Sequence, residues 1–328
     1  MADESSAAAD SPPPQPPPSS PTLLIPDLPD DVALQCIARV PRSRHPSISL
    51  VSKSWQSTLQ PTLPLLNVRV NSSFTWYLLD PNPASPNKLR TLSPLPPISS
   101  QPIASAYAVL GSKIYVIGGA INEIPSNCMW VFDCRFNKWE MGPRMRVGRE
   151  FAATGTVNGK IYVMGGCQVD NWARSVNWAE VFDPVSGSWT AVPSPVEARD
   201  KWMHASAVIH EKIYAMADRG GVVYDASGGK WGVVLKWLDM GWRGRAAVVD
   251  GEDVWKELKG VGKGLPKVLC GATMANVGGR LLEMEIICAG IEVQKDQNGD
   301  LSGSILWHDV ILVVPTRSSI VHCVAVGF

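Results

Sequence analysis

The segment that decides the fold is residues 158–166, NGKIYVMGG, because the chain contains it more than once. Residues 111–119, GSKIYVIGG, repeat it closely, and residues 210–218, HEKIYAMAD, repeat it more weakly. Each copy is a short run of apolar and aromatic residues bounded by turn residues, which is typical of a β-strand. Recurrence of such a run indicates repeated structural units.

A second strand and a tryptophan follow each copy. The sequences are VFDCRFNKW, VFDPVSGSW and VYDASGGKW, and the aspartate precedes the tryptophan by six residues in all three. Successive tryptophans lie 50 and 42 residues apart, a period that predicts the blades of a β-propeller and hence a mostly β protein. The paired glycines let backbones approach closely near the axis, and we expect the tryptophans to pack between blades.

Two places depart from this period. Trp255 follows Trp231 by only 24 residues, so about two strands are missing near residues 251–252. A similar shortening is expected at 282–283, after NVGGRLL. Residues 74–97, around Trp76 and Leu92, look like the last strands of an earlier unit. The sequence therefore predicts a propeller over residues 64–328 with one or two truncated blades and an unpaired strand edge, and it leaves ring closure open.

A different composition precedes the repeats. Residues 1–22 are rich in Pro, Ser and Ala and are predicted to be a disordered tail. Residues 23–63 predict a small helical module, with Pro29 and two aspartates beginning a helix in DDVALQCIARV and a second helix in ISLVSKSWQSTL, residues 48–59. This module has too few apolar residues for a core of its own, so we expect it to pack on a partner.

The overall composition limits the expected partners and the expected cellular location of the protein. Thirty basic residues balance thirty acidic ones, so neither nucleic acid nor a membrane surface is an expected partner. Features of a signal peptide and apolar runs of membrane-spanning length are both missing. The seven cysteines form no C-x-x-C pair, which favours reduced thiols in the cytoplasm or nucleus and predicts no zinc site.

The sequence contains no recognisable catalytic constellation. Nucleophile–base pairs, metal clusters and phosphate loops with usable spacing are missing, and no helix follows the glycine pairs. The five histidines fit structural or surface roles better than ligand roles. We therefore expect a protein without catalytic activity, cofactor or metal. A copper-radical oxidase on the same architecture is a less favoured alternative, because the six tyrosines do not form its ligand set.

Four loops carry arginine, and three of them also carry tryptophan. Residues 141–151, 196–204 and 238–246 precede the first strands of successive units and should gather at one end of the channel, and residues 167–178 lie between strands. Arginine beside an aromatic surface suits an acidic or phosphorylated peptide. The alternative is solvated charges and tryptophans packed between blades. The candidate residues are Arg144, Arg146, Arg149, Trp172, Arg174, Arg199, Lys201, Trp202, Trp242, Arg243 and Arg245.

The helical module resembles the F-box. That family's pattern begins with Leu-Pro and an acidic pair, continues through an aliphatic helix and ends in Leu-Val-(Cys or Ser)-Lys-x-Trp. In the family this module binds a Skp adaptor. By resemblance, the docking residues are Leu28, Pro29, Val32, Ile37, Leu50, Val51, Lys53 and Trp55.

The repeats resemble kelch repeats, whose signature is a double glycine followed by an aromatic-Asp pair and a tryptophan. The matching structural residues are Gly118, Gly119, Asp133, Trp139, Gly165, Gly166, Asp183, Trp189, Asp225 and Trp231. Together the chain is similar to plant F-box/kelch-repeat proteins. This resemblance implies a non-catalytic substrate adaptor of an SCF-type ubiquitin ligase, linked through the Skp adaptor to a cullin/RING ligase, with an unidentified protein substrate. A kelch scaffold without a ligase role is the alternative.

Overall fold

The computed structural model describes residues 24–40, 44–59, 63–70, 73–79, 92–100, 102–167, 177–199, 203–217, 220–236, 248, 259, 273–277, 280–284, 287–311 and 319–326. The chain forms two compact units, Met1–Val40 and Pro41–Phe328. Their boundary falls inside the segment 23–63 that the sequence predicts as one module. The predicted tail, residues 1–22, lies outside the described residues.

Helix α1, Asp30–Ala38, begins as the sequence predicts. Pro29 occupies the N-cap position, and Asp30 and Asp31 fill the first turn, where carboxylates interact favourably with the positive end of the helix. The backbone N–H of Leu24 donates to Oδ1 of Asp30 at 2.9 Å, which ties the preceding turn to the helix. Ala33 and Ile37, one turn apart, are buried.

The second predicted helix differs from the structure. Instead of one helix over 48–59, helix α2 covers His45–Ile48 and helix α3 covers Lys53–Thr58. Ser52 interrupts them because its backbone is extended and its hydroxyl oxygen accepts a hydrogen bond from the N–H of Trp55 at 3.1 Å, which caps α3. Leu50 and Val51 therefore lie in the turn before α3 rather than on a helical face.

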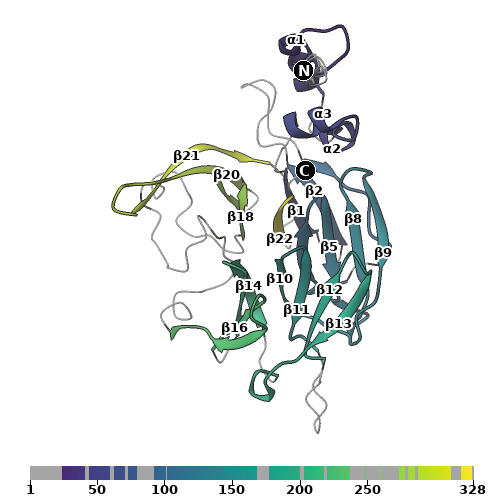
Figure 1. Ribbon diagram of the computed structural model, residues 1–328, viewed down its shortest axis with the longest axis vertical. Helices are drawn as coiled ribbons and strands as arrows, with labels where there is room; N and C mark the ends of the chain where they lie inside the picture. Colours follow the sequence, from purple (N-terminus) through teal and green to yellow (C-terminus); the bar gives the residue numbers. More distant parts are fainter. Residues whose placement is uncertain are drawn as a thin grey trace, which may run out of the picture. The chain divides into compact units, whose positions relative to one another are not determined.

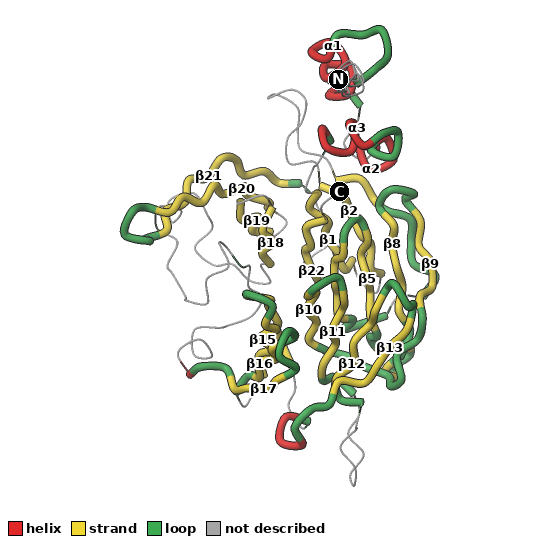
Figure 2. Tube along the Cα trace, in the orientation of Figure 1, coloured by secondary structure: helices red, strands yellow, loops and turns green. Residues whose placement is uncertain are grey.

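Five four-stranded antiparallel sheets make up most of the described part of the second unit (Figures 1 and 2). One sheet, β22-β1-β2-β3, joins strands that are distant in sequence: β22 (Ser319–Val326), β1 (Leu63–Val70), β2 (Ser73–Leu79) and β3 (Leu92–Pro94). Another sheet, β18-β19-β20-β21, follows the sequence repeats and consists of β18 (Thr273–Val277), β19 (Arg280–Met284), β20 (Ile287–Lys295) and β21 (Leu301–Val310).

The other three sheets contain the sequence repeats. They are β4-β5-β8-β9, from β4 (Ala106–Leu110), β5 (Lys113–Ile117), β8 (Met129–Asp133) and β9 (Lys138–Gly142); β10-β11-β12-β13, from β10 (Ala153–Val157), β11 (Lys160–Met164), β12 (Ala179–Asp183) and β13 (Ser188–Val192); and β14-β15-β16-β17, from β14 (Met203–Ile209), β15 (Lys212–Ala217), β16 (Val222–Asp225) and β17 (Lys230–Val233).

Smaller elements connect these strands: a two-stranded hairpin of β6 (Ala120–Ile121) and β7 (Ile124–Pro125), and a 3₁₀ turn, η2 (Val196–Ala198). The repeated KIY segments are the second strands of their sheets, the aspartates end the third strands, and the tryptophans lie in the fourth. The predicted mostly β propeller is confirmed.

The first sheet joins strands from both ends of the propeller. Strand β22 pairs with β1, with Leu65 opposite Val324 and Asn67 opposite His322, and Figure 1 shows the two strands side by side. The predicted early unit is present here as β2 and β3. First strands of neighbouring sheets also touch, since β22 contacts β4 and β18, and β10 contacts both β4 and β14. The ends of the propeller are therefore linked through one sheet.

The two predicted shortenings have different outcomes. Residues 282 and 283 lie within β19, whose partners β18 and β20 pair with it in a complete four-stranded sheet. The described strands show no interruption at this point, because Val277 ends β18, Arg280 begins β19 and the two strands pair with each other. The shortening near residues 251–252 lies outside the described residues.

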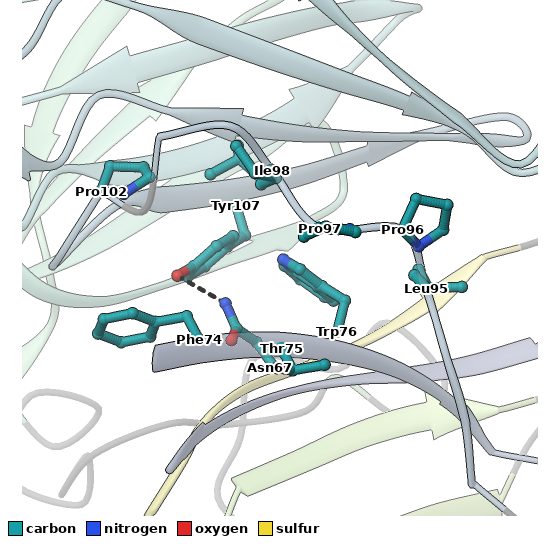
Figure 3. A pocket seen from close by; sticks show the side chains of 11 residues that line it. Asn67, Phe74, Thr75, Trp76, Leu95, Pro96, Pro97, Ile98, Pro102 and Tyr107 are labelled. Carbon is teal, nitrogen blue, oxygen red and sulfur yellow. Dashed lines mark hydrogen bonds between the residues drawn. The ribbon is translucent and has the colours of Figure 1, made fainter. Parts of the chain in front are cut away.

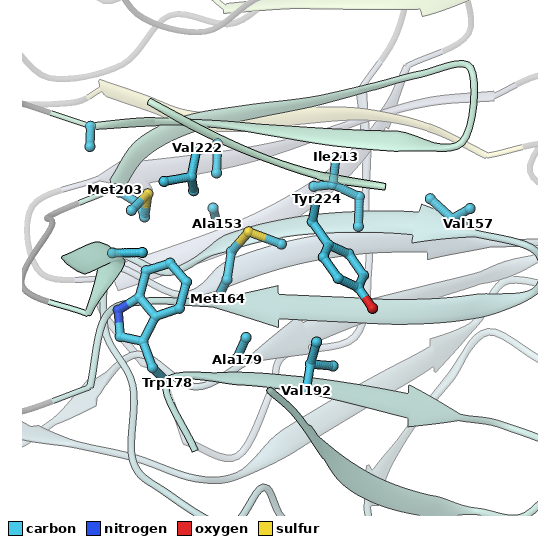
Figure 4. Close-up of a cluster of buried hydrophobic side chains, with 13 residues drawn as sticks. Ala153, Val157, Met164, Trp178, Ala179, Val192, Met203, Ile213, Val222 and Tyr224 are labelled. Atoms are coloured by element: carbon cyan, nitrogen blue, oxygen red, sulfur yellow. The ribbon is translucent and has the colours of Figure 1, made fainter. Parts of the chain in front are cut away.

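The hydrophobic core lies between the faces of neighbouring sheets. Figure 4 shows one such cluster, in which Met164 and Trp178 pack with Met203, Ile213 and Tyr224. These side chains come from the β10–β13 sheet, its loops and the β14–β17 sheet. Among the described residues, no helix has the length and hydropathy needed to cross a membrane.

Candidate functional site

The paired glycines bring several loops together. Gly118 and Gly119 both have positive φ, and the N–H of Gly119 donates to the carbonyl oxygen of Arg149 at 2.7 Å. A Cβ on Gly118 would lie 2.5 Å from that same oxygen, so a side chain would collide with the backbone of the next connection. In the next repeat the glycine is the acceptor instead, since the N–H of Glu150, in the connection leading into the same sheet, donates to the carbonyl oxygen of Gly166 at 2.9 Å.

Isolated β-bridges complete this arrangement. Ile103 pairs with Ala120, and Arg149 pairs with both Ser126 and Cys167. The N–H of Phe151 donates to the carbonyl oxygen of Ala104 at 2.8 Å. Segments 102–105, 118–128, 143–151 and 165–167 thus form one continuous surface, which we call the loop face. Of the loops that the sequence predicts to gather, residues 141–151 contribute 143–151 to this face, and residues 167–178 contribute Cys167.

Arg149 has a structural role, which corrects its assignment as a substrate-binding candidate. Its side chain is fully buried, and its guanidinium donates to a carboxylate oxygen of Glu180 at 2.8 Å. Further donations go to the carbonyl oxygens of Gly165 at 2.7 Å and Trp178 at 2.8 Å, and to that of Asn177. These bonds tie the β9–β10 connection to the following sheet, so the guanidinium is not available to a partner. Sequence patterning missed this role because nothing local marks an arginine whose partner is 31 residues away.

The remaining arginine candidates differ in their environments. Arg144 and Arg146 are exposed on the loop face. Arg144 donates to the side-chain oxygen of Asn127 at 3.4 Å, and the backbone N–H of Arg146 donates to Glu180 at 2.9 Å. Arg199 is half-buried and donates to the carbonyl oxygen of Ser194 at 2.8 Å, so it braces its own loop. The candidates outside the described residues are Trp172, Arg174, Lys201, Trp202, Trp242, Arg243 and Arg245.

Three apolar residues on the loop face are exposed, which the sequence did not predict. Ile103 and Phe151 are each 54% exposed, and Ile124, in the β6–β7 hairpin, is 69% exposed. Phe151 also has φ of 53°, a left-handed conformation that is rare for a bulky residue. Apolar residues are normally assigned to the core from sequence, so only a tertiary arrangement could show these three facing solvent.

The repeated tryptophans connect neighbouring sheets. Trp139, Trp189 and Trp231 each donate an indole N–H to a proline carbonyl of the preceding connection. The acceptors are Pro96 at 2.8 Å, Pro143 at 2.9 Å and Pro193 at 2.6 Å. Each ring also contacts an aromatic residue of its own sheet, as Trp189 does Phe182 at 5.2 Å between ring centroids. Tryptophan at the same repeat position therefore links neighbouring sheets in the same way three times, and we call these three contacts the tryptophan joints.

The repeated aspartates close the hairpins between third and fourth strands. Oδ1 of Asp133, Asp183 and Asp225 accepts from the backbone N–H two residues later, at 2.8–3.0 Å. All three carboxyl pKa values lie below the usual 3.8. For Asp183 the main cause is the hydrogen bond from Lys160, and for Asp225 it is the N–H of Gly228. Burial raises the pKa of Asp133, but the hydrogen bonds and charge of Arg135 outweigh it.

The described cysteines are all free thiols. Burial raises the pKa of Cys134 to about 12 and also raises that of Cys167, so both are protonated near neutral pH. Within the described ranges, no three His, Cys, Asp or Glu side chains cluster closely enough to hold a metal ion.

The F-box candidates are partly exposed and partly buried. Val32, Leu50 and Val51 are 38%, 49% and 64% exposed, and Pro29 and Lys53 also face solvent. Leu28 and Trp55 are half-buried, and Ile37 is only 4% exposed. Leu34, which the sequence analysis did not select, is 43% exposed. Ile37 therefore supports the module internally, while the exposed apolar residues are free to meet another surface.

Two protein families match the chain. The F-box domain family matches residues 25–60, and the family described as FKB95, Kelch-repeats domain, matches residues 76–312. The second match covers well over half of the chain. The chain belongs to the F-box/kelch-repeat family. In this F-box/kelch-repeat protein, the loop face and the tryptophan joints are parts of the kelch propeller, and α1 to α3 fall within the F-box match.

Two curated proteins and one solved structure are similar to this chain. F-box/kelch-repeat protein At4g39550 of Arabidopsis thaliana is 33% identical, over 92% of this chain and 93% of its own length. Putative F-box/kelch-repeat protein At3g27910 of Arabidopsis thaliana is 33% identical over 90% of both chains. The solved structure titled "Structure of YjhT" aligns with 70% of this chain and 73% of its own, with 16% identity and a TM-score of 0.41.

The alignment with the first relative is longer than this chain. It extends over 371 positions, although the chain has 328 residues. The relative therefore contains segments without a counterpart here.

Proposed function

We propose that this F-box/kelch-repeat protein is a substrate-recognition adaptor of an SCF-type ubiquitin ligase. Its F-box would dock to a Skp-family adaptor and through it to a cullin/RING ligase, and its propeller would hold the protein to be ubiquitinated. The observation that carries the proposal is the exposure of Val32, Leu50 and Val51 within the F-box match. Each is an apolar side chain left in water, which favours burial against a partner.

The proposed role requires no chemistry from this chain. Ubiquitin transfer would belong to associated subunits, and the adaptor would raise the concentration of substrate near the transferring enzyme. We also propose a cytoplasmic or nuclear location, which the free thiols of the described cysteines support.

Docking is tested by capture of a purified Skp-family adaptor. Val51→Asp places a charge on an exposed apolar position before α3, and Gln56→Asp places the same charge on an exposed polar position within α3. We expect the first variant to weaken capture at least tenfold and the second to retain it. Equal capture by Val51→Asp and wild type would contradict docking and favour a kelch scaffold without a ligase role. Ile37 is unsuitable for this test because it is buried.

For substrate binding we propose the loop face. Its exposed arginines, Arg144 and Arg146, lie on a surface that also exposes Ile103, Ile124 and Phe151. This combination suits a segment with acidic and apolar side chains. Proteins captured from cells treated with a proteasome inhibitor should disappear from the double variant Arg144→Ala/Phe151→Ser and remain with Lys138→Ala, an exposed cation on β9. Retention of the same set by the double variant would exclude this surface.

A further inference from the structure

The turn between β8 and β9, residues 133–138, is bonded to helix α2. The hydroxyl of Ser47 donates to the carbonyl oxygen of Arg135 at 2.7 Å, across 88 positions of sequence. The backbone N–H of Leu50 donates in turn to the carbonyl oxygen of Ser47 at 3.3 Å. Two hydrogen bonds therefore link Leu50, in the segment after α2, to the residue that precedes Phe136. Both ends of this link belong to one compact unit, Pro41–Phe328.

Phe136 is a large apolar side chain left in water at this β8–β9 turn. It is 62% exposed, and the guanidinium carbon of Arg135 lies 5.3 Å from the centre of its ring. Leu50 and Val51, which the F-box match includes, are exposed as well. The turn and the adjoining F-box segment each offer apolar surface, and its burial against a partner is favourable.

The charge beside Phe136 is neutralised within the turn. Nε and Nη2 of Arg135 donate to the two carboxylate oxygens of Asp133 at 2.9 and 2.6 Å. This two-point pairing fixes the guanidinium on its own turn. Arg135 and Asp133 therefore add no net charge next to the ring, which favours a partner surface that is itself apolar.

Trp139 holds the base of the β8–β9 turn. Its ring lies 4.9 Å from that of Phe132 and 6.5 Å from that of Trp76, between centroids, and its indole N–H donates to the carbonyl oxygen of Pro96. Trp76 and Pro96 also line a small pocket between the first sheet and the connection to β4, as Figure 3 shows. The turn is thus fixed to the first sheet as well as to α2. A partner would meet a preformed surface and would lose less free energy in ordering it.

The fold itself does not require an aromatic residue at this position. The three hairpin turns share the aspartate and the tryptophan, but Ser186 and Gly228 stand where the β8–β9 turn has Phe136. All three turns nevertheless close in the same way, through the aspartate carboxylate. The ring at position 136 is therefore not needed to close its turn.

We propose that the Skp-family adaptor buries Phe136 together with Leu50 and Val51, so that the propeller itself forms part of the docking interface. This inference rests on the proposed function, because it extends the F-box surface that we assign to the adaptor. The choice of occupant follows from continuity, since the hydrogen bonds through Ser47 join the β8–β9 turn to the F-box segment. Aromatic side chains are enriched among the residues that dominate the binding energy of such interfaces.

The same arrangement leaves the loop face open. Strand β8 begins at Met129, next to the loop-face segment 118–128, and ends at Asp133, in the β8–β9 turn. A strand of 5 residues spans roughly 17 Å, so the adaptor surface and the loop face lie at opposite ends of one sheet. Adaptor and substrate can then bind at the same time.

The affinity of the full chain for a purified Skp-family adaptor, measured by biolayer interferometry, tests the contact. Phe136→Ser removes the ring, and Val185→Ser removes a 96% exposed apolar side chain from the β12–β13 turn. We expect the first variant to raise the Kd at least fivefold, because the ring no longer adds to the apolar area removed from water, and the second to leave it unchanged. Equal Kd values for Phe136→Ser and wild type would overturn the proposal.

Photo-crosslinking locates the contact and decides the matter if Phe136→Ser fails to fold. The crosslinkable residue p-benzoylphenylalanine is placed at position 136, 51 or 185 of the full chain, and the adaptor is added before irradiation. We expect adducts from positions 51 and 136 and none from position 185. Adducts from position 51 alone would overturn this inference and retain F-box docking, whereas adducts from none of the three would contradict both. Adducts from position 185 as strong as those from position 136 would show unspecific contact and would also overturn the inference.

Discussion

The guanidinium of Arg149 donates to the carboxylate of Glu180 at 2.8 Å, and neither side chain is exposed to solvent. Glu180 lies in β12, while Arg149 lies in the connection before β10. The pair therefore fixes one edge of the loop face to the sheet that supports it. Buried ion pairs are sensitive to loss of one partner, because the other charge stays behind without compensation.

Glu180→Gln should lower the free energy of unfolding by about 3–5 kcal/mol, because it leaves the Arg149 charge unpaired in the interior. Urea unfolding followed by tryptophan fluorescence measures the change. The control is Glu140→Gln, which breaks the ion pair with Lys138 between two side chains that are 69% and 68% exposed. That change should cost about 1 kcal/mol or less. Equal effects of the two substitutions would contradict a structural role for the buried pair.

The paired glycines allow a sharper comparison. Gly166 and Gly159 have φ of 70° and 72°, so alanine is strained at either position by about 1–2 kcal/mol. A Cβ on Gly159 meets no atom within 4 Å, whereas one on Gly166 would press on the carbonyl oxygen of Glu150. Gly166→Ala should therefore destabilise clearly more than Gly159→Ala in thermal unfolding. Equal shifts would show that backbone conformation alone, without close approach, requires the glycine.

The tryptophan joints should differ in strength. Trp189 is 7% exposed and Trp231 is half-buried, although both donate to a proline carbonyl. Trp189→Phe should lower the free energy of unfolding by roughly 2–3 kcal/mol, because it removes the hydrogen bond and leaves a void in a packed site. Trp231→Phe should cost less, since solvent can replace the lost contacts. Urea titrations of the two variants measure the order, and a reversed order would refute the argument from burial.

The three hairpin aspartates predict acid sensitivity. Their pKa values are lower in the folded chain than the usual 3.8, so the folded state favours the ionised form. The associated stability is fully present above about pH 5 and is lost as the pH falls through the folded pKa values. The triple variant Asp133→Asn/Asp183→Asn/Asp225→Asn should lose less melting temperature between pH 7 and pH 3 than wild type. A parallel decline of both proteins would contradict the prediction.

The sequence predicts the repeated parts well and the singular parts poorly. Trp139, Trp189 and Trp231 recur with the strands around them, so their period predicts the propeller directly. Arg149 has a distant partner and, among the described residues, no repeat equivalent with the same role, so residue spacing does not predict its burial. Ser52 interrupts a plausible helix through a cap that depends on local backbone angles. Phe151 depends on contacts between connections, which composition does not encode.

The pairing of β1 with β22 should be required for cooperative folding of the propeller. Leu65 and Leu66 in β1 are each 1% exposed, and they lie opposite Val324 and Cys323, which are themselves buried. Deleting residues 319–328 would remove buried side chains worth about 2–5 kcal/mol each and leave the hydrogen-bonding edge of β1 unpaired. We expect loss of the cooperative thermal transition and concentration-dependent aggregation. Deleting residues 327–328 alone should keep the transition, because β22 ends at Val326. A cooperative transition in the longer deletion would mean that the sheets do not need the strand from the far end of the chain.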